Sequence, residues 1–362
     1  MRKKRGGVLR FLRNGKLIEK VCLGLLMASA VSFVLLGNAW GSEKSVVDMG
    51  GKSVFVPEKV ERILITCYGG VTQEIAVLGL AEKIVGQPSM ERFPLLLSRY
   101  PAFGELPHAG SFNNINVEEA LKLRPDLVLA SVTAEKGNQQ LRDVGLPVVT
   151  VLTGRADMET LQKEFLLLGS LTGQEVRARE LVDYWQKILG LLEERLASLS
   201  QGERKRVYYM LGNPLHTNGS AWWGEAFIRT AGGINVASEM GKVRDVNVEQ
   251  LLQWDPDVLI LSSNEGKPVL RGDLEEDPRL CNLRALRENS VYYCPIGAFW
   301  WDRPSPEAAL GFLWLATTLY PERFSDVDLH EETKYFFEKF YEISLTEEQV
   351  EGFLDPFGAE EL

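Results

Sequence analysis

Apolar residues occur along this 362-residue chain in two alternating patterns. Short continuous apolar runs, such as those in RILITCYGG (62–70) and KRVYYMLG (205–212), are typical of strands buried on both faces of a parallel sheet. Longer segments with apolar residues three and four positions apart, such as METLQKEFLLLGSLTG and SPEAALGFLWLATTLYP, predict helices. Because the two patterns alternate, the predicted fold class is α/β with parallel sheets.

One helix–strand unit occurs twice. NVEEALKLRPDLVLAS at 116–131 and NVEQLLQWDPDVLILS at 247–262 are identical at seven of sixteen positions. In each copy an Asn is placed to cap a helix, a Glu follows in the first turn, and Pro-Asp breaks the helix before a short apolar run. Similar strand and helix signals surround each copy, so two α/β lobes of similar order are predicted.

The two predicted lobes are separated by a helical segment. Residues 157–200 contain no strand signal, and QEVRARELVDYWQKILGLLEERLASL predicts a helix of about 26 residues, or about 39 Å at ~1.5 Å per residue. A stiff helix of this length acts as a strut rather than as a flexible hinge. The predicted organisation is a signal peptide at 1–41, an N-terminal lobe at 42–156, linking helices at 157–203, and a C-terminal lobe with C-terminal helices at 204–362.

The N-terminus has the pattern of an export signal. Residues 1–20 carry eight Lys or Arg and one acid, 21–36 are apolar, and Ala39 and Gly41 give a small-x-small exit. The alternative is an uncleaved anchor, which the length disfavours because ~20 apolar residues are needed to span a bilayer. We therefore expect cleavage near Gly41 and a soluble protein in a bacterial periplasm.

The net charge limits which molecules the protein can bind, and the cysteines raise the question of a disulfide. The whole chain has a net charge of −10, and removing residues 1–41 makes it more acidic because that segment carries eight basic residues and one acidic residue. Such a surface repels phosphate backbones, which argues against nucleic acid and favours a basic partner. Beyond the predicted signal lie Cys67, Cys281 and Cys294, for which a Cys281–Cys294 disulfide and buried free thiols are both compatible hypotheses.

Several sequence segments, in the order in which they occur along the chain, resemble one protein family. They are RILITCYGG, EIAVLGL and KIVGQP, the two repeats, the long helix, AGGINVA and WWDRPSPEAAL. Together they resemble the periplasmic solute-binding proteins of ABC importers for iron–siderophore complexes, haem and cobalamin, over nearly the whole mature chain. The resemblance implies two Rossmann-like lobes joined by a single long helix, with the ligand in a cleft between them. It also implies a monomer without catalytic residues or a covalently bound cofactor.

The resemblance suggests why the glutamate is repeated. In that family the glutamate of each repeat docks into arginines on the two subunits of the permease, and the matching positions here are Glu118 and Glu249. A carboxylate opposite an arginine gives an orienting, bidentate contact. The alternative is that each glutamate only complements its helix N-terminus, which contributes ~0.3–1 kcal/mol. Matched positions in a duplicated unit favour docking.

Loops at the carboxyl ends of parallel strands are where such sheets bind ligands. In this chain those loops carry aromatic and cationic side chains, which suit a large planar or chelate ligand, although some of the aromatic residues are expected to be structural. The predicted ligand-binding residues are Tyr68, Ser111, Phe112, Trp222, Trp223, Arg244, Trp300, Trp301 and Arg303.

An iron chelate or a corrinoid is the expected ligand. Phe112 falls where cobalamin-binding relatives carry a tryptophan, and haem-binding relatives often carry a tyrosine where this chain has Ser111. Direct metal-ion capture, an alternative, needs converging histidines, but His108, His216 and His330 are far apart in the sequence. A secreted glycosidase is a further alternative, and no recognisable catalytic motif supports it. Haem stays open, and no metal ligand is predicted.

Overall fold

The computed structural model describes residues 43–152, 157–263 and 269–357. The predicted signal peptide and its cleavage site lie outside these ranges. Within them, no helix combines the length and the apolar character needed to cross a membrane. The described residues from Ser45 onward form one compact unit, and the architecture below is that of this unit.

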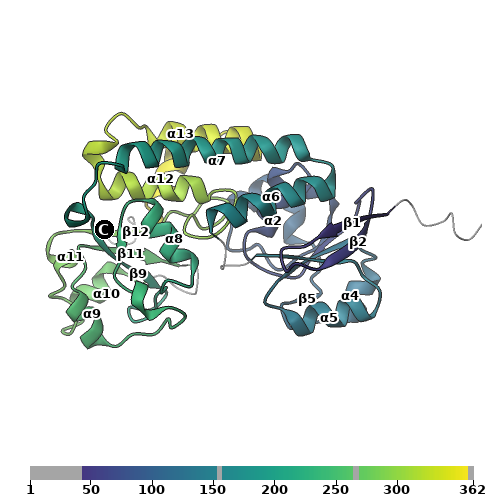
Figure 1. The fold of residues 1–362 in the computed structure, drawn as a ribbon, viewed down its shortest axis with the longest axis horizontal. Coiled ribbons are helices and arrows are strands. Elements are labelled where there is room, and N and C mark those ends of the chain that lie inside the picture. Colours follow the sequence, from purple (N-terminus) through teal and green to yellow (C-terminus); the bar gives the residue numbers. More distant parts are fainter. Residues whose placement is uncertain (1–42, 153–156, 264–268, 358–362) are drawn as a thin grey trace, which may run out of the picture. The chain divides into compact units, whose positions relative to one another are not determined.

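Two four-stranded parallel sheets have the same strand order, and Figure 1 labels β9, β11 and β12 of the C-terminal one. The order is β4-β3-β7-β8 in the N-terminal sheet and β10-β9-β11-β12 in the C-terminal one, so in each sheet the first strand lies between the second and the third. The predicted α/β fold with two similar parallel sheets is confirmed. The strands are β3 (Ile63–Ile65), β4 (Ile84–Gly86), β7 (Leu127–Ser131), β8 (Val148–Val151), β9 (Arg206–Leu211), β10 (Ile234–Asn235), β11 (Val258–Ser262) and β12 (Val291–Tyr293).

Helices cover the sheets, and the central strands are apolar apart from the serines that end β7 and β11, because both of their faces are buried. Two small sheets pair β1 (Glu43–Val47) with β2 (Ser53–Pro57) and β5 (Gly110–Ser111) with β6 (Asn114–Ile115). The helices are α2 (Val71–Val77), α3 (Pro94–Arg99), α4 (Val117–Lys122), α5 (Glu135–Asp143), α6 (Met158–Thr172), α7 (Glu175–Leu196), α8 (Trp223–Thr230), α9 (Val248–Trp254), α10 (Arg271–Glu276), α11 (Arg284–Arg287), α12 (Ala308–Leu319), α13 (Leu329–Phe336), which continues into a π-helical turn at Phe337–Tyr341, and α14 (Glu347–Leu354).

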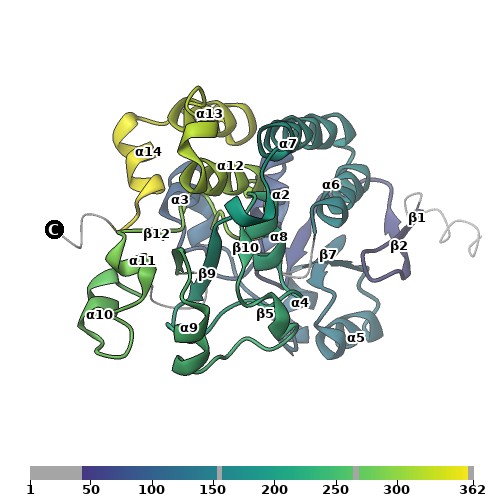
Figure 2. The same ribbon diagram turned by 60° about the vertical axis from the view of Figure 1, so that its left-hand side comes forward.

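Helix α7 is the predicted strut. It has 22 residues, which at ~1.5 Å per residue is about 33 Å, and Figures 1 and 2 show it running along the same side of the structure as α12 and α13. Its buried residues recur at helical spacing, and the indole N–H of Trp185 donates to the carbonyl of Pro306 at 2.9 Å. The predicted helix was about four residues longer because it included Gln174 and residues 197–199, uncharged residues that fit either a helix or a turn.

The C-terminal segment provides a second connection, which the sequence did not indicate. The carboxylate of Glu342 forms ion pairs with Arg99 at 3.1 Å and with Arg177 at 3.3 Å. The buried amide of Gln73, on α2, donates to the carbonyl of Ala298 at 2.9 Å. The lobes are therefore fastened along more than one segment. Each sheet lies inside its predicted lobe, and the division at residues 156 and 203 remains a prediction.

The repeated residues that were expected to be structural have matching roles. Asn116 and Asn247 each accept a hydrogen bond from the backbone N–H three residues on, at 3.1 and 2.7 Å, so both are helix N-caps as predicted. Each unit then passes through a residue of positive φ directly before its proline, Arg124 at 46° and Asp255 at 38°. The proline ends both helices in the same way.

The repeated aspartates tie each unit to the strand before it. A carboxylate oxygen of Asp126 accepts from the backbone N–H of Arg62 at 2.9 Å, and one of Asp257 accepts from that of Arg206 at 2.8 Å. Asp257 also pairs with the guanidinium of Arg284. These contacts position β7 beside β3 and β11 beside β9.

Replacing Asp257 with alanine should therefore lower the free energy of unfolding by about 2 kcal/mol, because a backbone donor and a guanidinium both lose their acceptor. Urea denaturation at neutral pH measures this change. Asp183→Ala is the matched control, since Asp183 is an exposed carboxylate on α7. Equal loss of stability in the two variants would contradict the structural role of Asp257.

Candidate functional site

The carboxyl edges of the two sheets face each other across an aromatic cluster. The loop after β4 carries Arg92 and Phe93, and the loop after β12 carries Phe299 and Trp300. The centroid of the Phe93 ring lies 5.0 Å from that of Phe299 and 4.8 Å from that of Trp300. The guanidinium of Arg92 lies 4.7 Å from the Trp300 ring and donates to the carbonyl of Ser263 at 2.8 Å. The loops that follow the strands of both lobes thus meet at one place.

Trp300 fastens this cluster. Its indole N–H donates to the hydroxyl of Ser263, directly after β11, at 3.1 Å, and only 8% of the residue is exposed. An edge-to-face contact with Phe299, 5.0 Å between centroids, holds the ring from another side. In this arrangement Trp300 joins the loops after β11 and β12 and has little surface left for a ligand.

Two of the tryptophans predicted to bind ligand lie in the hydrophobic core. Trp301 is fully buried and its indole N–H donates to the carboxylate of Glu307 at 2.9 Å. Trp223 is 1% exposed and stacks on Phe312 at 5.5 Å. The structure does not bring either ring to the facing edges, because neighbouring residues in each Trp-Trp pair turn in different directions and the second of each pair turns inward.

The partly exposed residues of the C-terminal lobe form a cationic corner. The guanidinium of Arg244 lies 5.0 Å from the ring of Trp222, whose indole N–H donates to the carbonyl of Lys242 at 3.2 Å. The backbone carbonyl of Arg244 accepts from Thr217 at 2.8 Å, which joins the loop after β9 to the loop before α9. The structure therefore brings together Trp222 and Arg244, two of the residues predicted to bind ligand.

A cavity of about 450 Å³ lies at the carboxyl end of β9, beside this corner. The ring nitrogen Nδ1 of His216 lies 2.6 Å from the carboxylate of Asp245 in its wall. An imidazole held by a carboxylate keeps a fixed orientation. The lining residues are Leu211, Gly212, Asn213, Leu215, His216, Asp245 and Val246.

The residues predicted in the N-terminal lobe lie together at the end of β3. Tyr68 is 42% exposed, and Ser111 and Phe112 are half-buried in the β5–β6 hairpin. The backbone N–H of Phe112 donates to the carbonyl of Thr66 at 2.8 Å, which places the hairpin beside the Tyr68 loop. Gly137 on α5 permits this, since a Cβ there would lie 2.0 Å from the carbonyl oxygen of Phe112.

Arg303 is half-buried next to the aromatic cluster, and its backbone N–H donates to the carbonyl of Trp300 at 3.3 Å. The adjacent Asp302 is buried and accepts from the phenol of Tyr209, whose pKa is raised by burial. Arg92 was missed by the sequence analysis. Its only signal was its place in the loop after the short strand KIVG.

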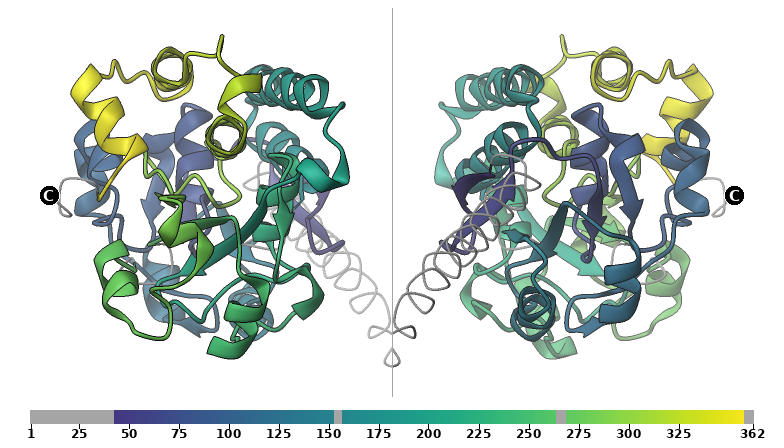
Figure 3. Two further views of the ribbon diagram at one scale, coloured as in Figure 1. Left: turned by 90° about the vertical axis from the view of Figure 1, so that its left-hand side faces the viewer. Right: turned by 90° about the vertical axis from the view of Figure 1, so that its right-hand side faces the viewer.

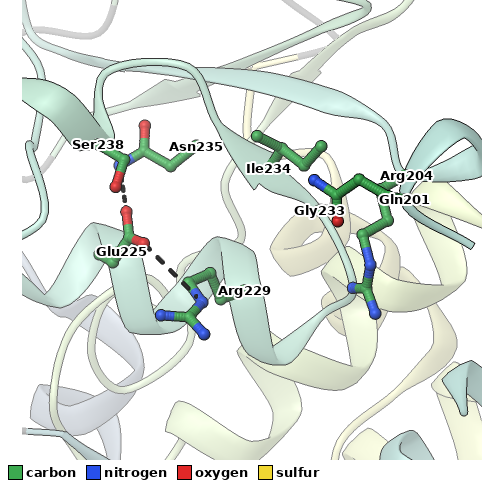
Figure 4. A pocket seen from close by; sticks show the side chains of 8 residues that line it. All are labelled: Gln201, Arg204, Glu225, Arg229, Gly233, Ile234, Asn235 and Ser238. Carbon is green, nitrogen blue, oxygen red and sulfur yellow. Dashed lines mark hydrogen bonds and ion pairs between the residues drawn. The ribbon is translucent and has the colours of Figure 1, made fainter.

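A second cavity, of about 510 Å³, lies between α8 and β10 (Figure 4). Its wall holds Glu225, which accepts from the amide of Asn235 at 3.0 Å and lies 3.9 Å from the guanidinium of Arg229. The cavity opens toward Arg204 and the start of β10, at the opposite edge of the sheet from the facing loops. No group of three or more metal-ligating side chains occurs among the described residues.

The three cysteines beyond the predicted signal are free thiols in the structure. Cys67 and Cys294 are buried, and burial raises the pKa of both thiols, which keeps them protonated and unreactive. Cys281 is half-buried. Cys281 and Cys294 therefore form no disulfide in the structure, which agrees with the hypothesis of free thiols.

The repeated glutamates occupy matching, exposed positions. Glu118 and Glu249 lie in the first turns of α4 and α9, and neither makes a hydrogen bond or ion pair within the described ranges. Figures 1 and 2 show α4 and α9 on the side of their lobes opposite α7, and Figure 3 shows the two lobes end on.

Comparison with known proteins is consistent with this geometry. Residues 64–296 match the family described as periplasmic binding protein. The chain is 29% identical over 344 residues to the molybdate-binding protein MolA of Haemophilus influenzae, covering 88% of this chain and 95% of that protein. It is 25% identical over 257 residues to the vitamin B12-binding protein of Vibrio parahaemolyticus, covering 69% and 86% of the two chains.

A solved structure of Haemophilus influenzae MolA bound to molybdate superimposes with a TM-score of 0.74 at 27% identity, covering 84% of this chain and 99% of that one. A periplasmic solute-binding protein of Veillonella parvula gives 0.75 at 26% identity, covering 87% and 98%. The fold is that of a two-lobed periplasmic solute-binding protein, and these relatives and structural neighbours are binding proteins, not enzymes. The chain belongs to the periplasmic binding protein family.

Proposed function

We propose that this protein is the substrate-binding subunit of an ABC importer and that it captures an anionic metal species at the facing edges of its two sheets. The observation that carries the proposal is the concentration of cationic side chains there in a chain of net charge −10. Arg92, Lys242, Arg244 and Arg303 all lie on loops at these edges. Of the acids on the same loops, Asp245 is paired with His216, Asp302 is buried and accepts from Tyr209, and Glu91 is exposed. An anion placed between guanidinium groups gains charge-assisted hydrogen bonds.

A metal oxyanion is the first candidate ligand. The similarity to the molybdate-binding protein MolA extends over nearly the whole length of both chains, in sequence and in structure. A small oxyanion needs only a few converging donors, and the arginines and backbone N–H groups at these edges are of the required kind.

An iron chelate or a corrinoid, the ligand expected from the sequence, is the second candidate. It is favoured by the partly exposed aromatic side chains of Tyr68, Phe112 and Trp222, which offer flat surfaces on both lobes. Similarity to vitamin B12-binding and Fe(3+)-citrate-binding proteins agrees with it, over a smaller share of this chain.

Delivery completes the proposed function. The protein works in the periplasm as a single chain and presents Glu118 and Glu249 to two permease subunits. The support is that both carboxylates are exposed, lie at equivalent places in two lobes, and have no structural role comparable to that of the neighbouring Asn and Asp residues.

Titration calorimetry with molybdate, tungstate, sulfate, ferric citrate and cyanocobalamin tests the ligand. One of the metal-containing anions should bind, and at a hundredfold excess over its Kd it should stabilise the protein by about 2.7 kcal/mol in a thermal unfolding experiment. Binding of cyanocobalamin alone, which has no net charge, would favour the corrinoid and contradict an anionic ligand. Arg244→Ala should weaken binding of the anion about tenfold or more, because a hydrogen bond to a charged group contributes about 1.5–3 kcal/mol. Arg229→Ala, in the cavity at α8, is the control and should bind as the wild type does. If none of the metal species binds, the ligand class is wrong.

A further inference from the structure

Most of the identical positions of the repeat have a structural role inside their own lobe. The asparagines cap α4 and α9, the prolines end them, and the aspartates bind the preceding strand. The repeated valines are half-buried and the repeated serines are buried in the sheets. Two identical pairs are left without such a role, the glutamates and the leucines at 121 and 252.

These leucines are exposed, which is unusual for residues kept identical in two copies. Leu121 is 44% exposed and Leu252 is 41% exposed, while Ala120 and Leu251, one position earlier, are fully buried. Single exposed leucines are common on protein surfaces and need no explanation. An exposed leucine at the same place in both copies does.

Each leucine lies beside the glutamate of its own copy. Residues three positions apart on a helix are neighbours on one face, so Glu118 is adjacent to Leu121 and Glu249 to Leu252. Each lobe therefore presents the same small patch, an apolar side chain with a carboxylate next to it. We call these the two Glu–Leu patches.

We propose that the two Glu–Leu patches are two copies of one contact and that each is occupied by one of the two membrane-spanning subunits of the importer. This inference rests on the proposed function and adds the leucines to it. The matching surface on each subunit is an apolar pocket flanked by a basic side chain. A patch that occurs twice on one chain fits a partner that presents one surface twice.

The charge of the patches favours this occupant over a second copy of the same chain. Each patch carries a carboxylate, and the chain as a whole is acidic, so pairing patch to patch would bring like charges together. A partner that is basic and presents the same surface twice avoids this repulsion and matches both patches. Burying the rest of each leucine contributes to the free energy of binding through the hydrophobic effect, which salt does not screen. The carboxylate beside it contributes through its charge, which salt does screen.

The test uses the full-length mature protein and the importer's membrane and ATP-hydrolysing subunits, co-purified and placed in lipid nanodiscs. Binding is measured for Leu121→Ala, Leu252→Ala and the double variant at 0.1 and 0.5 M NaCl. Each single change should weaken binding about five- to tenfold, and the double change about 25- to 100-fold, in proportion to the apolar area removed. The ratio of the Kd of each leucine variant to the Kd of the wild type should be nearly the same at both salt concentrations.

Leu166→Ala/Val176→Ala is the control, since these exposed apolar residues lie on α6 and α7. It should bind the nanodiscs as the wild type does, and all variants should keep the wild-type thermal stability and ligand affinity.

If the double leucine variant binds like the control while Glu118→Ala/Glu249→Ala does not, the role of the leucines is overturned and delivery stands. A loss confined to one leucine overturns the twofold contact. Weaker ligand binding by the leucine variants would place them in the solute site instead. Failure of the wild type to bind would overturn delivery itself, independently of the ligand titrations.

Discussion

Replacing Glu118 and Glu249 together with alanine should reduce solute uptake and importer-stimulated ATP hydrolysis by about thirtyfold or more, while ligand affinity stays within about twofold. Both carboxylates are exposed, and neither lies among the loops that meet at the aromatic cluster. Removing one partner of a desolvated contact between an arginine and a carboxylate costs about 2–5 kcal/mol, and 2 kcal/mol corresponds to about thirtyfold. Uptake by cells and ATP hydrolysis by reconstituted importer measure the effect, and calorimetry measures ligand affinity.

The chain offers a close control for this experiment. Glu119 follows Glu118 on the same helix but corresponds to Gln250 in the second copy, so the repeat does not require a carboxylate there. Glu119→Gln should transport normally. Each single alanine change should be milder than the double change, and added salt should narrow the difference from wild type. Normal transport by the double variant would leave both glutamates as residues that only complement their helices.

The second large effect concerns a buried carboxyl group. Glu307 lies directly before α12 and is fully buried, and its two carboxylate oxygens accept hydrogen bonds from the indole of Trp301 at 2.9 Å and the phenol of Tyr341 at 2.8 Å. Burial raises its pKa from 4.5 to about 8. The folded protein therefore holds a proton on Glu307 between about pH 4.5 and pH 8 that the unfolded chain has released.

The free energy of unfolding should consequently fall as the pH rises from about 4.5 to about 8. The contribution is fully present below the pKa of the unfolded chain and is lost as the pH passes through the folded value. A shift of this size corresponds to about 5 kcal/mol for one group. Urea denaturation across this pH range measures it.

Glu307→Gln should remove the share of this dependence that Glu307 contributes and make the protein more stable than wild type at pH 8. The amide oxygen can accept from Trp301 and the amide N–H can donate to the oxygen of Tyr341, so the core stays filled. Glu348→Gln, on the surface of α14, is the control and should follow the wild-type curve. An unchanged slope in Glu307→Gln would show that the carboxyl is ionised in the folded protein.

Some pH dependence should persist in Glu307→Gln because a second buried acidic site remains. Glu164 on α6 accepts from the backbone N–H of Leu152, and its pKa is raised to about 8 by burial. Glu74 on α2 is fully buried near it, and its pKa is raised by burial and then by the charge of Glu164. These two groups act in the same direction as Glu307.

The sequence alone was sufficient for features that depend on neighbours along the chain. The buried strands, the capping asparagines 116 and 247, the prolines that end α4 and α9, and the similar order of helices and strands along the two lobes all follow from short-range patterns and from their repetition. Such patterns indicate which face of a segment is apolar and where its backbone hydrogen bonds are capped, and both depend on residues that are close together in the sequence. The equivalence of Glu118 and Glu249 was visible for the same reason.

The tertiary structure decided which side chains meet. Trp222 and Trp223 are adjacent in the sequence, yet one lies under Arg244 at the surface and the other is in the core. Arg92 reaches Ser263 across 171 positions of sequence. Packing between distant segments determines these contacts, because a loop side chain is buried only where another segment folds against it, as Phe312 of α12 does against Trp223. The same packing buried Ala120 and Leu251 and left Leu121 and Leu252 in solvent beside the repeated glutamates.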